Sequence, residues 1–191
     1  SKSKWSNDAG WMTSSSVCEW YGIVCREGKV TEMTLSFNNL ASTLPDELSL
    51  LTDLEVLSLS GAAGTGQVKG SLTGSIPSSW GKRMVNLVAL ELYDNQLSGE
   101  LPSSLQFLTD LEMLNVDGNK LFGPLPSEIG AMTSLEILDV SSNDFSGPIP
   151  TEFGLLTNLL SLKMSGSEFT GFLPTHLGNL KSMKEFHAQN N

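Results

Sequence analysis

The sequence predicts an α/β solenoid, in which short strands and short helical turns alternate along a stack of similar coils. Three observations predict it. A leucine-rich frame recurs every 24 residues, apolar and polar residues alternate within each frame, and Gly and Pro close its segments. A single coil of this length cannot bury its own leucines, so neighbouring coils must stack and share a continuous apolar core.

The repeat is defined by its starting residues. In the second half of the chain these are Leu87, Leu111, Leu135, Leu159 and Met183, spaced 24 residues apart. Two earlier copies begin at Val30 and Leu54. We therefore expect an N-terminal cap over residues 1–29 and about seven coils over residues 30–191, the last of them incomplete. Because the chain stops at the turn residue of its last coil, we expect it to be part of a longer protein.

The coil over residues 111–130 shows how one frame specifies local structure. Residues 114–117 alternate between apolar and polar side chains, which predicts a short strand with one buried face. Residues 121–126 resume the alternation and end in a Pro, which lacks a backbone donor and stops strand pairing. Residues 127–130 are expected to form one helical turn, with Ser127 as its cap and Gly130 as its stop.

A turn residue, usually Asn, follows the strand of each coil. An Asn side chain can satisfy backbone groups of its own coil and of the neighbouring coil. We therefore expect stacked copies to form a ladder of amide hydrogen bonds. The ladder residues are Asn38, Asn95, Asn119, Asn143 and Asn191. Ser167 occupies this position in one coil, and we expect that rung to be weaker.

The overall charge excludes several partner classes. The 191 residues contain 11 Lys and Arg against 21 Asp and Glu, a formal net charge of −10. This charge argues against binding of nucleic acid phosphates and against docking on anionic lipid by charge alone. No run of about 18 apolar residues occurs, so we expect no membrane span in this segment.

The complete frame L-x-x-L-x-L-x-x-N-x-L-x-G-x-[IL]-P resembles the plant-type leucine-rich repeat. Ectodomains of receptor-like kinases and polygalacturonase-inhibiting proteins contain this repeat. The resemblance covers the chain from about Val30 to Asn191. It implies a right-handed superhelix with a parallel sheet on the concave face and short helical or 3-10 turns on the convex face.

The cysteines allow two interpretations. They could form a metal-ligand pair, but zinc needs four ligands, and the two histidines, His176 and His187, lie far away in the sequence. The segment 18–25 resembles the C-x-W-x-G-[VI]-x-C element of the family's N-terminal cap, which implies a disulfide between Cys18 and Cys25. A disulfide indicates an extracellular, cell-surface or secretory-pathway location.

Two further features concern the cap and the repeat spacing. Trp5, Trp11 and Trp20 are expected to pack in the cap, and the alternative is an exposed aromatic platform for carbohydrate. Leu59 and Leu72 lie 13 positions apart where other coils have five, so residues 61–70 contain an insertion. Its Gly-rich composition suits a tolerated surface excursion or a recognition loop. Residues 81–84 absorb a second, one-residue insertion.

The sequence contains no recognisable catalytic constellation. Nucleophilic catalysis needs a Ser, Cys or Thr beside a base that a third group orients. Neither histidine lies in such a motif, and the acidic residues are scattered over repeat positions. We therefore expect no catalytic residue, no cofactor and no metal in this segment.

Outward residues of successive strands are expected to form columns across the concave face. The central column is Thr34, Ser58, Glu91, Asn115, Asp139, Lys163 and His187, and the next is Ser36, Ser60, Tyr93, Asp117, Ser141, Ser165 and Gln189. This face is polar, acid-biased and varied, with Tyr93 as its one large aromatic residue. Such variation on a rigid scaffold suits selective recognition, although the solvent face of any solenoid is polar. The expected ligand-binding residues are Glu91, Tyr93, Asp94, Asn115, Asp117, Asp139, Ser141, Lys163 and His187.

Three functions are compatible with these features. The first is a receptor or adhesion ectodomain that binds a protein, peptide or glycan through the concave face. The second, implied by the resemblance, is a secreted inhibitor of a cell-wall-degrading enzyme. A basic rim on that enzyme would then contact Asp117 and Asp139 of this chain. The third is a structural or ice-binding solenoid, which the mixed charges of the central column disfavour.

Overall fold

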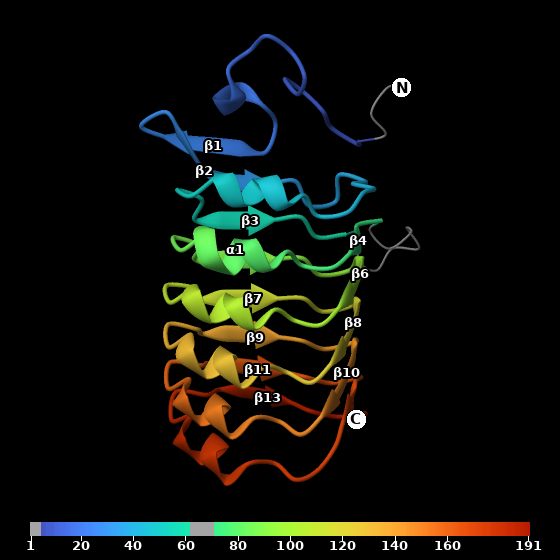
Figure 1. Ribbon diagram of the computed structural model, residues 1–191, viewed down its shortest axis with the longest axis vertical. Helices are drawn as coiled ribbons and strands as arrows, with labels where there is room; N and C mark the ends of the chain where they lie inside the picture. The colour runs from blue at the N-terminus through green and yellow to red at the C-terminus, as the bar shows by residue number, and fades with distance from the viewer. Residues whose placement is uncertain (1–4, 62–70) are drawn as a thin grey trace.

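The computed structural model describes residues 5–61 and 71–191, so most of the insertion expected over residues 61–70 lies outside the described residues. The coils stack along one axis, with the N-terminus at one end of the stack and the C-terminus towards the other (Figure 1). Each repeat contributes a strand of the main sheet, and most add a second short strand and a helical turn. The architecture is the α/β solenoid that the repeat predicts.

The main sheet has eight strands in the order β1-β2-β3-β5-β7-β9-β11-β13 and lines the concave side. Its strands are β1 (Ile23–Arg26), β2 (Lys29–Thr34), β3 (Val56–Ser58), β5 (Ala89–Glu91), β7 (Met113–Asn115), β9 (Ile137–Asp139), β11 (Ser161–Lys163) and β13 (Glu185–His187). β1 pairs with β2 antiparallel, and each later pair is parallel.

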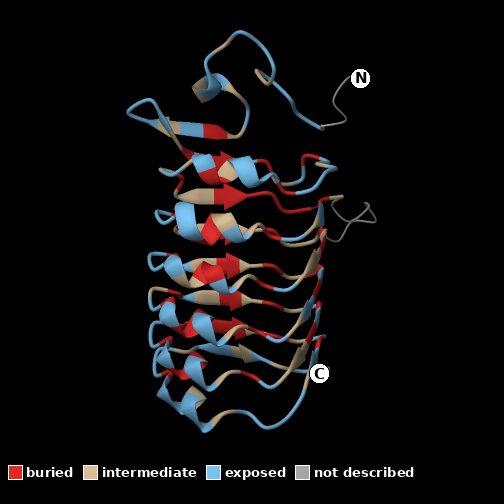
Figure 2. Cartoon of the chain, in the orientation of Figure 1, coloured by how far each residue is buried: buried red, intermediate tan, exposed pale blue. Residues whose placement is uncertain are grey.

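The predicted leucine interior is confirmed. Leu90, Leu114, Leu138 and Leu162 pair in one register, and each has no exposed surface. They belong to one apolar cluster that extends from Ile23 in the cap to Leu180 near the end of the chain. Figure 2 shows buried segments in the coils that precede the last one, which follows from coils that cover one another's apolar faces.

A second parallel sheet runs along one side of the stack (Figure 1). Its strands are β4 (Thr73–Gly74), β6 (Gln96–Gly99), β8 (Lys120–Gly123), β10 (Asp144–Gly147) and β12 (Glu168–Phe169). The alternation over residues 121–126 indicates strand-like backbone but does not indicate a second sheet. The pairing depends on adjacent coils, because each strand is too short to be stable without its neighbours.

Short helices connect the second strand of one coil to the main sheet of the next. They are α1 (Ser78–Arg83), η2 (Asp46–Leu50), η3 (Ser103–Phe107), η4 (Ser127–Ala131), η5 (Thr151–Leu155) and η6 (Thr175–Asn179), while η1 (Val17–Glu19) lies in the cap. The η elements are 3-10 helices. In α1 the Met84 N–H donates to the Trp80 carbonyl at 2.9 Å, an i→i−4 bond. The one-residue insertion over 81–84 therefore converts a 3-10 turn into an α-helix.

The expectation that Ser127 caps its helical turn and Gly130 stops it is wrong. Pro126 is the N-cap without a side-chain bond, and the Ser127 hydroxyl donates to Glu128 at 3.3 Å. Gly130 lies inside η4, where a Cβ atom would be 2.6 Å from the Glu152 carbonyl oxygen of the next coil. Glycine at this position allows adjacent helical turns to approach closely, which only a residue without a side chain permits.

The N-terminal cap is held by a disulfide and an aromatic cluster. Cys18 and Cys25 are joined at an S–S distance of 2.08 Å, as the cap motif implies. The ring centroids of Trp5 and Trp11 lie 4.8 Å apart, and those of Trp11 and Trp20 are also 4.8 Å apart. All three tryptophans pack against the apolar cluster, so they cover the first coil as expected.

The side chains of the turn Asn residues bond to backbone groups of two coils. The Asn143 amide donates to the carbonyls of Val116 at 3.0 Å and Ser141 at 2.9 Å, while its oxygen accepts the Leu121 N–H at 3.0 Å. Asn95 and Asn119 make the same set of bonds in their coils. Such fully satisfied amides fix the spacing between coils.

The two end residues of the expected ladder differ from the middle ones. Asn38 is buried and bonds the backbone N–H and carbonyl of Asn7 at 2.6 and 2.7 Å, which ties the cap to the first coil. Asn191 is exposed, although its amide donates to the Met164 and Ala188 carbonyls. At Asn38 the cap takes the place of a preceding coil of the standard frame.

Candidate ligand-binding face

The register of the main sheet aligns the outward residues of the central column. Residue by residue, strand pairing joins Thr34, Ser58, Glu91, Asn115, Asp139, Lys163 and His187 in one line across the concave face. Seven strands at a spacing of about 4.8 Å make this column about 29 Å long. The column thus presents a different polar side chain at each coil.

Several polar residues of the central column are fixed by local hydrogen bonds. The Asn115 side-chain oxygen accepts the Asp117 N–H at 3.0 Å, and Asp139 Oδ1 accepts the Ser141 N–H at 3.1 Å. Such short-range bonds hold each side chain against its own turn. Lys163 pairs with Glu185 at 3.8 Å, a partly exposed ion pair of small energetic value.

The second column follows along the turns after the strands. Backbone N–H groups of one coil donate to the carbonyls of Ser60, Tyr93, Asp117, Ser141, Ser165 and Gln189 in the next. Asp94 lies one residue beyond Tyr93 with a φ of +55°, and its Oδ1 would be 2.8 Å from a Cβ atom at Gly118. The structure therefore brings Glu91, Tyr93 and Asp94 together, whereas His187 lies three strands away from Glu91's neighbour β7, on β13 at the C-terminal edge of the sheet.

A third column, not included in the sequence-based site, is apolar. Val56, Ala89, Met113 and Ile137 pair in register two residues before the central column, and all four are half-buried. Residues two apart on a strand share a face, so this apolar stripe lies beside the polar column on the concave side. The signal was present as the third residue of each L-x-x-L frame, where four consecutive coils have an apolar residue.

Tyr93 is not the one large aromatic residue of this face, because Phe37 accompanies it. The Phe37 side chain is 54% exposed, and its ring centroid lies 6.3 Å from that of Tyr93 with an interplanar angle of 63°. Burial, and after it the charge of Glu91, raises the pKa of the Tyr93 hydroxyl above its ordinary value of 10.0. The phenol therefore remains neutral at physiological pH. Phe37 immediately precedes the turn Asn38, a position that the repeat frame leaves variable.

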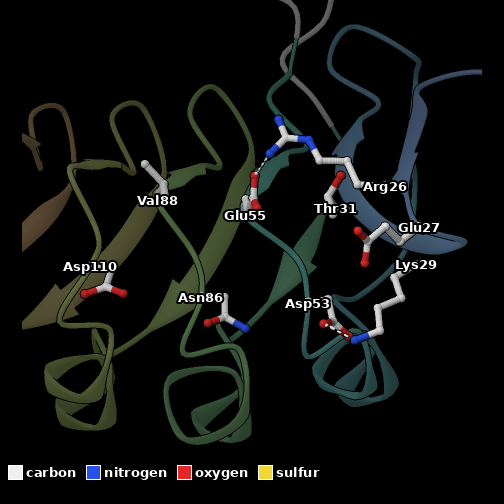
Figure 3. Close-up of a pocket in the computed structure, with 9 residues that line it drawn as sticks. All are labelled: Arg26, Glu27, Lys29, Thr31, Asp53, Glu55, Asn86, Val88 and Asp110. Atoms are coloured by element: carbon white, nitrogen blue, oxygen red, sulfur yellow. Dashed lines mark hydrogen bonds and ion pairs between the residues drawn. The ribbon is translucent and has the colours of Figure 1, made fainter.

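A charged groove lies at the edge where β2, β3 and β5 begin, and its lining residues Glu55 and Val88 directly precede Val56 and Ala89 of the apolar stripe (Figure 3). It has a volume of about 580 Å³. Its cations are already paired, since Arg26 reaches Glu55 at 2.7 Å and Lys29 reaches Asp53 at 2.8 Å. The groove therefore offers little uncompensated positive charge to a ligand.

Other kinds of site are not found in the described ranges, residues 5–61 and 71–191. No group of three or more His, Cys, Asp or Glu side chains there is arranged to hold a metal ion. In the same part of the chain, no helix has the length and apolar character needed to cross a membrane.

Comparison with known proteins identifies the repeat. A family model described as Leucine Rich Repeat matches residues 86–108, 110–132 and 134–156. One chain of the BIR3–SERK2 complex from Arabidopsis thaliana is 31% identical with a TM-score of 0.72, over 86% of this chain and 84% of that chain. This chain belongs to the leucine-rich-repeat family. The resemblance to plant-type repeats is therefore confirmed.

Two further relatives of this leucine-rich-repeat chain are receptor kinases. The ectodomain of the Arabidopsis receptor kinase HAESA, solved with an IDA peptide hormone ligand, is 30% identical with a TM-score of 0.82, over 93% of this chain and 29% of that chain. An inactive leucine-rich repeat receptor-like serine/threonine-protein kinase of Arabidopsis thaliana is 39% identical over 105 residues. That match covers 54% of this chain and 14% of the kinase, so the chain spans a small part of this relative.

Proposed function

We propose that this leucine-rich-repeat chain is a non-catalytic recognition module of a cell-surface receptor and binds an extended peptide segment of its partner on the concave face. The observation that carries this proposal is the apolar stripe of Val56, Ala89, Met113 and Ile137 beside a polar column that changes from coil to coil. Apolar contacts supply affinity, and varied polar neighbours supply selectivity.

The spacing of the strands suits a peptide that runs along the solenoid axis. Coils repeat about every 4.8 Å, whereas an extended chain advances about 3.3 Å per residue, so three residues of a peptide match two coils. The central column would then accommodate roughly nine extended residues. A peptide is favoured over a glycan because the apolar stripe offers four aliphatic side chains and few hydrogen-bonding groups.

Two observations support an extracellular location. The Cys18–Cys25 disulfide is typical of oxidising compartments. The related HAESA structure is a receptor ectodomain in complex with a peptide hormone. We propose that this chain lies outside the cell and belongs to a protein of the same general kind.

Panning a random twelve-residue peptide library against the immobilised chain tests this function. We expect the chain to retain peptides and the Ile137→Glu variant to lose them, because the new carboxylate interrupts the apolar stripe. Leu155→Glu is the matched control, since Leu155 lies on η5 among the helical turns and is 58% exposed. Both variants should keep the thermal melt of the parent chain.

Two outcomes would contradict the proposal. In the first, the parent chain retains no peptide above background. In the second, the Ile137→Glu variant retains as many peptides as the parent chain while the Leu155→Glu control loses them. A purified polygalacturonase assayed with the same chain provides a separate test. Inhibition of the enzyme without peptide retention would favour the inhibitor function instead.

A further inference from the structure

Phe37 occupies a backbone position that disfavours large side chains. Six residues at the equivalent turn have a positive φ of 52 to 69°: Phe37, Asp94, Gly118, Ser142, Gly166 and Asn190. Left-handed backbone suits glycine and is tolerated by Asn and Asp, while a bulky residue there is an outlier. Five of the six residues are small or polar, and Phe37 at +60° is the exception.

Core packing does not explain this side chain. Phe37 is 54% exposed and does not belong to the apolar cluster. Its ring contacts Tyr93, which lies two coils further along the stack. Gly61 takes the equivalent position in the intervening coil and is buried without a side chain. The small residue between them leaves the two rings free to meet above the concave face.

The surroundings of the two rings are negatively charged. Glu91 is the last residue of β5 and lies two residues before Tyr93, and Asp94 directly follows Tyr93. Both carboxylates act on the phenol electrostatically. The hydroxyl of Ser58 donates to Glu91 Oε2 at 3.3 Å, which orients this carboxylate. Aromatic faces attract cations through their quadrupole, and carboxylates nearby strengthen the attraction. Arginine in particular stacks on aromatic rings and bonds carboxylates.

We propose that Phe37 and Tyr93, together with the carboxylates of Glu91 and Asp94, form a binding site for an arginine or lysine side chain of the partner. The proposal rests on the proposed function and specifies which part of the peptide the N-terminal end of the concave face recognises. In this site the exposed Phe37 side chain, on its strained backbone, contacts the cation and does not serve the stability of the fold.

The test uses the full chain and two small probes that differ in charge: N-acetyl-arginine methylamide and its neutral isostere N-acetyl-citrulline methylamide. The ring signals of Phe37 and Tyr93 in ¹H–¹³C NMR spectra report binding. We expect the arginine probe to shift both sets of signals saturably and the citrulline probe to bind about tenfold more weakly. Equal binding of the two probes, or no shift with arginine, would overturn the proposal.

The variant Phe37→Gly separates binding from stability. Glycine accepts the positive φ, so the melting temperature should stay equal or rise while the arginine response of Tyr93 is lost. Ser142→Gly changes the same backbone position in another coil and should leave the arginine response intact. A lowered melting temperature in Phe37→Gly would show that the ring has a structural role, contrary to the proposal. An unchanged arginine response in this variant would contradict the cation site.

Failure of this inference can be told apart from failure of the proposed function. Retained library peptides combined with no arginine response would leave the proposed function in place and remove the cation site. An arginine response without retained peptides would support the cation site and contradict the proposed function.

Discussion

The side-chain oxygen of Asn119 accepts the backbone N–H of Leu97, one coil earlier, at 3.0 Å. The amide nitrogen of Asn119 donates in the same direction to the Leu92 carbonyl at 3.0 Å and within its own turn to the Val116 carbonyl at 2.9 Å. One buried side chain therefore satisfies backbone groups of two coils that lack a strand partner there. The distance between adjacent coils therefore depends on the hydrogen bonds that individual Asn side chains make.

Replacement of Asn119 by Ala should lower the free energy of unfolding by about 1–3 kcal/mol, because a buried backbone donor and several acceptors lose their partner. Chemical denaturation of both chains measures the difference. Asn158→Ala is the control, since Asn158 is exposed and its amide bonds a single carbonyl, that of Thr133. If the two variants unfold at the same denaturant concentration as the parent, the ladder contributes no stability.

Introduction of Asn at Ser167 should stabilise the chain by about 1 kcal/mol. Ser167 stands at the ladder position, and its buried hydroxyl has no hydrogen-bond partner within the described residues. An Asn side chain there can reach backbone groups of two coils, as Asn143 does. The thermal melt of Ser167→Asn should exceed that of the parent and of the exposed control Ser182→Asn. A lower melt would mean that this coil is spaced differently.

Substitution of Gly130 by Ala should destabilise the chain by about 1–3 kcal/mol, the usual cost of an overpacked contact. The added Cβ atom would lie 2.6 Å from the Glu152 carbonyl oxygen. Gly178 takes the same place in η6 and has no atom within 4 Å of such a Cβ. Gly178→Ala should therefore be neutral or slightly stabilising, since Ala is the better helix former. Equal effects of the two substitutions in denaturation would disprove the stacking role.

The midpoint of Tyr93 ionisation should lie above pH 10.0, because burial and the charge of Glu91 raise its pKa. Because the pKa of Tyr93 is higher in the folded chain than in the unfolded chain, its neutral form contributes to stability. This contribution is fully present below the pKa of the unfolded chain and is lost as the pH rises through the pKa of the folded chain. The difference in tyrosine absorbance between the parent and Tyr93→Phe, followed through a pH titration, isolates this group. A midpoint at or below 10.0 would contradict the burial of the phenol.

Much of the fold follows from the spacing of single residues. The 24-residue period predicts which leucines face inward, and Leu90, Leu114, Leu138 and Leu162 are buried in one register. The cap motif predicts the disulfide by resemblance. These features are accessible because burial within one coil depends on the local alternation of apolar and polar residues.

The parts that sequence reasoning missed are contacts between coils. Gly130 resembles a helix stop until the next coil is placed against it. The apolar stripe becomes visible when the third residues of four coils are aligned in the sheet. The pairing of Phe37 with Tyr93 joins residues on either side of an insertion and two coils apart. A single coil contains no signal for such partners.

The sequence by itself thus determined the period, the buried leucines, the turn Asn positions and the acidic character of the chain. The tertiary structure decided which outward side chains meet, which glycines permit close stacking and where aromatic rings and carboxylates converge. The physical reason is that local patterns specify the conformation of each coil. The contacts between coils depend instead on the spacing and register at which successive coils pack.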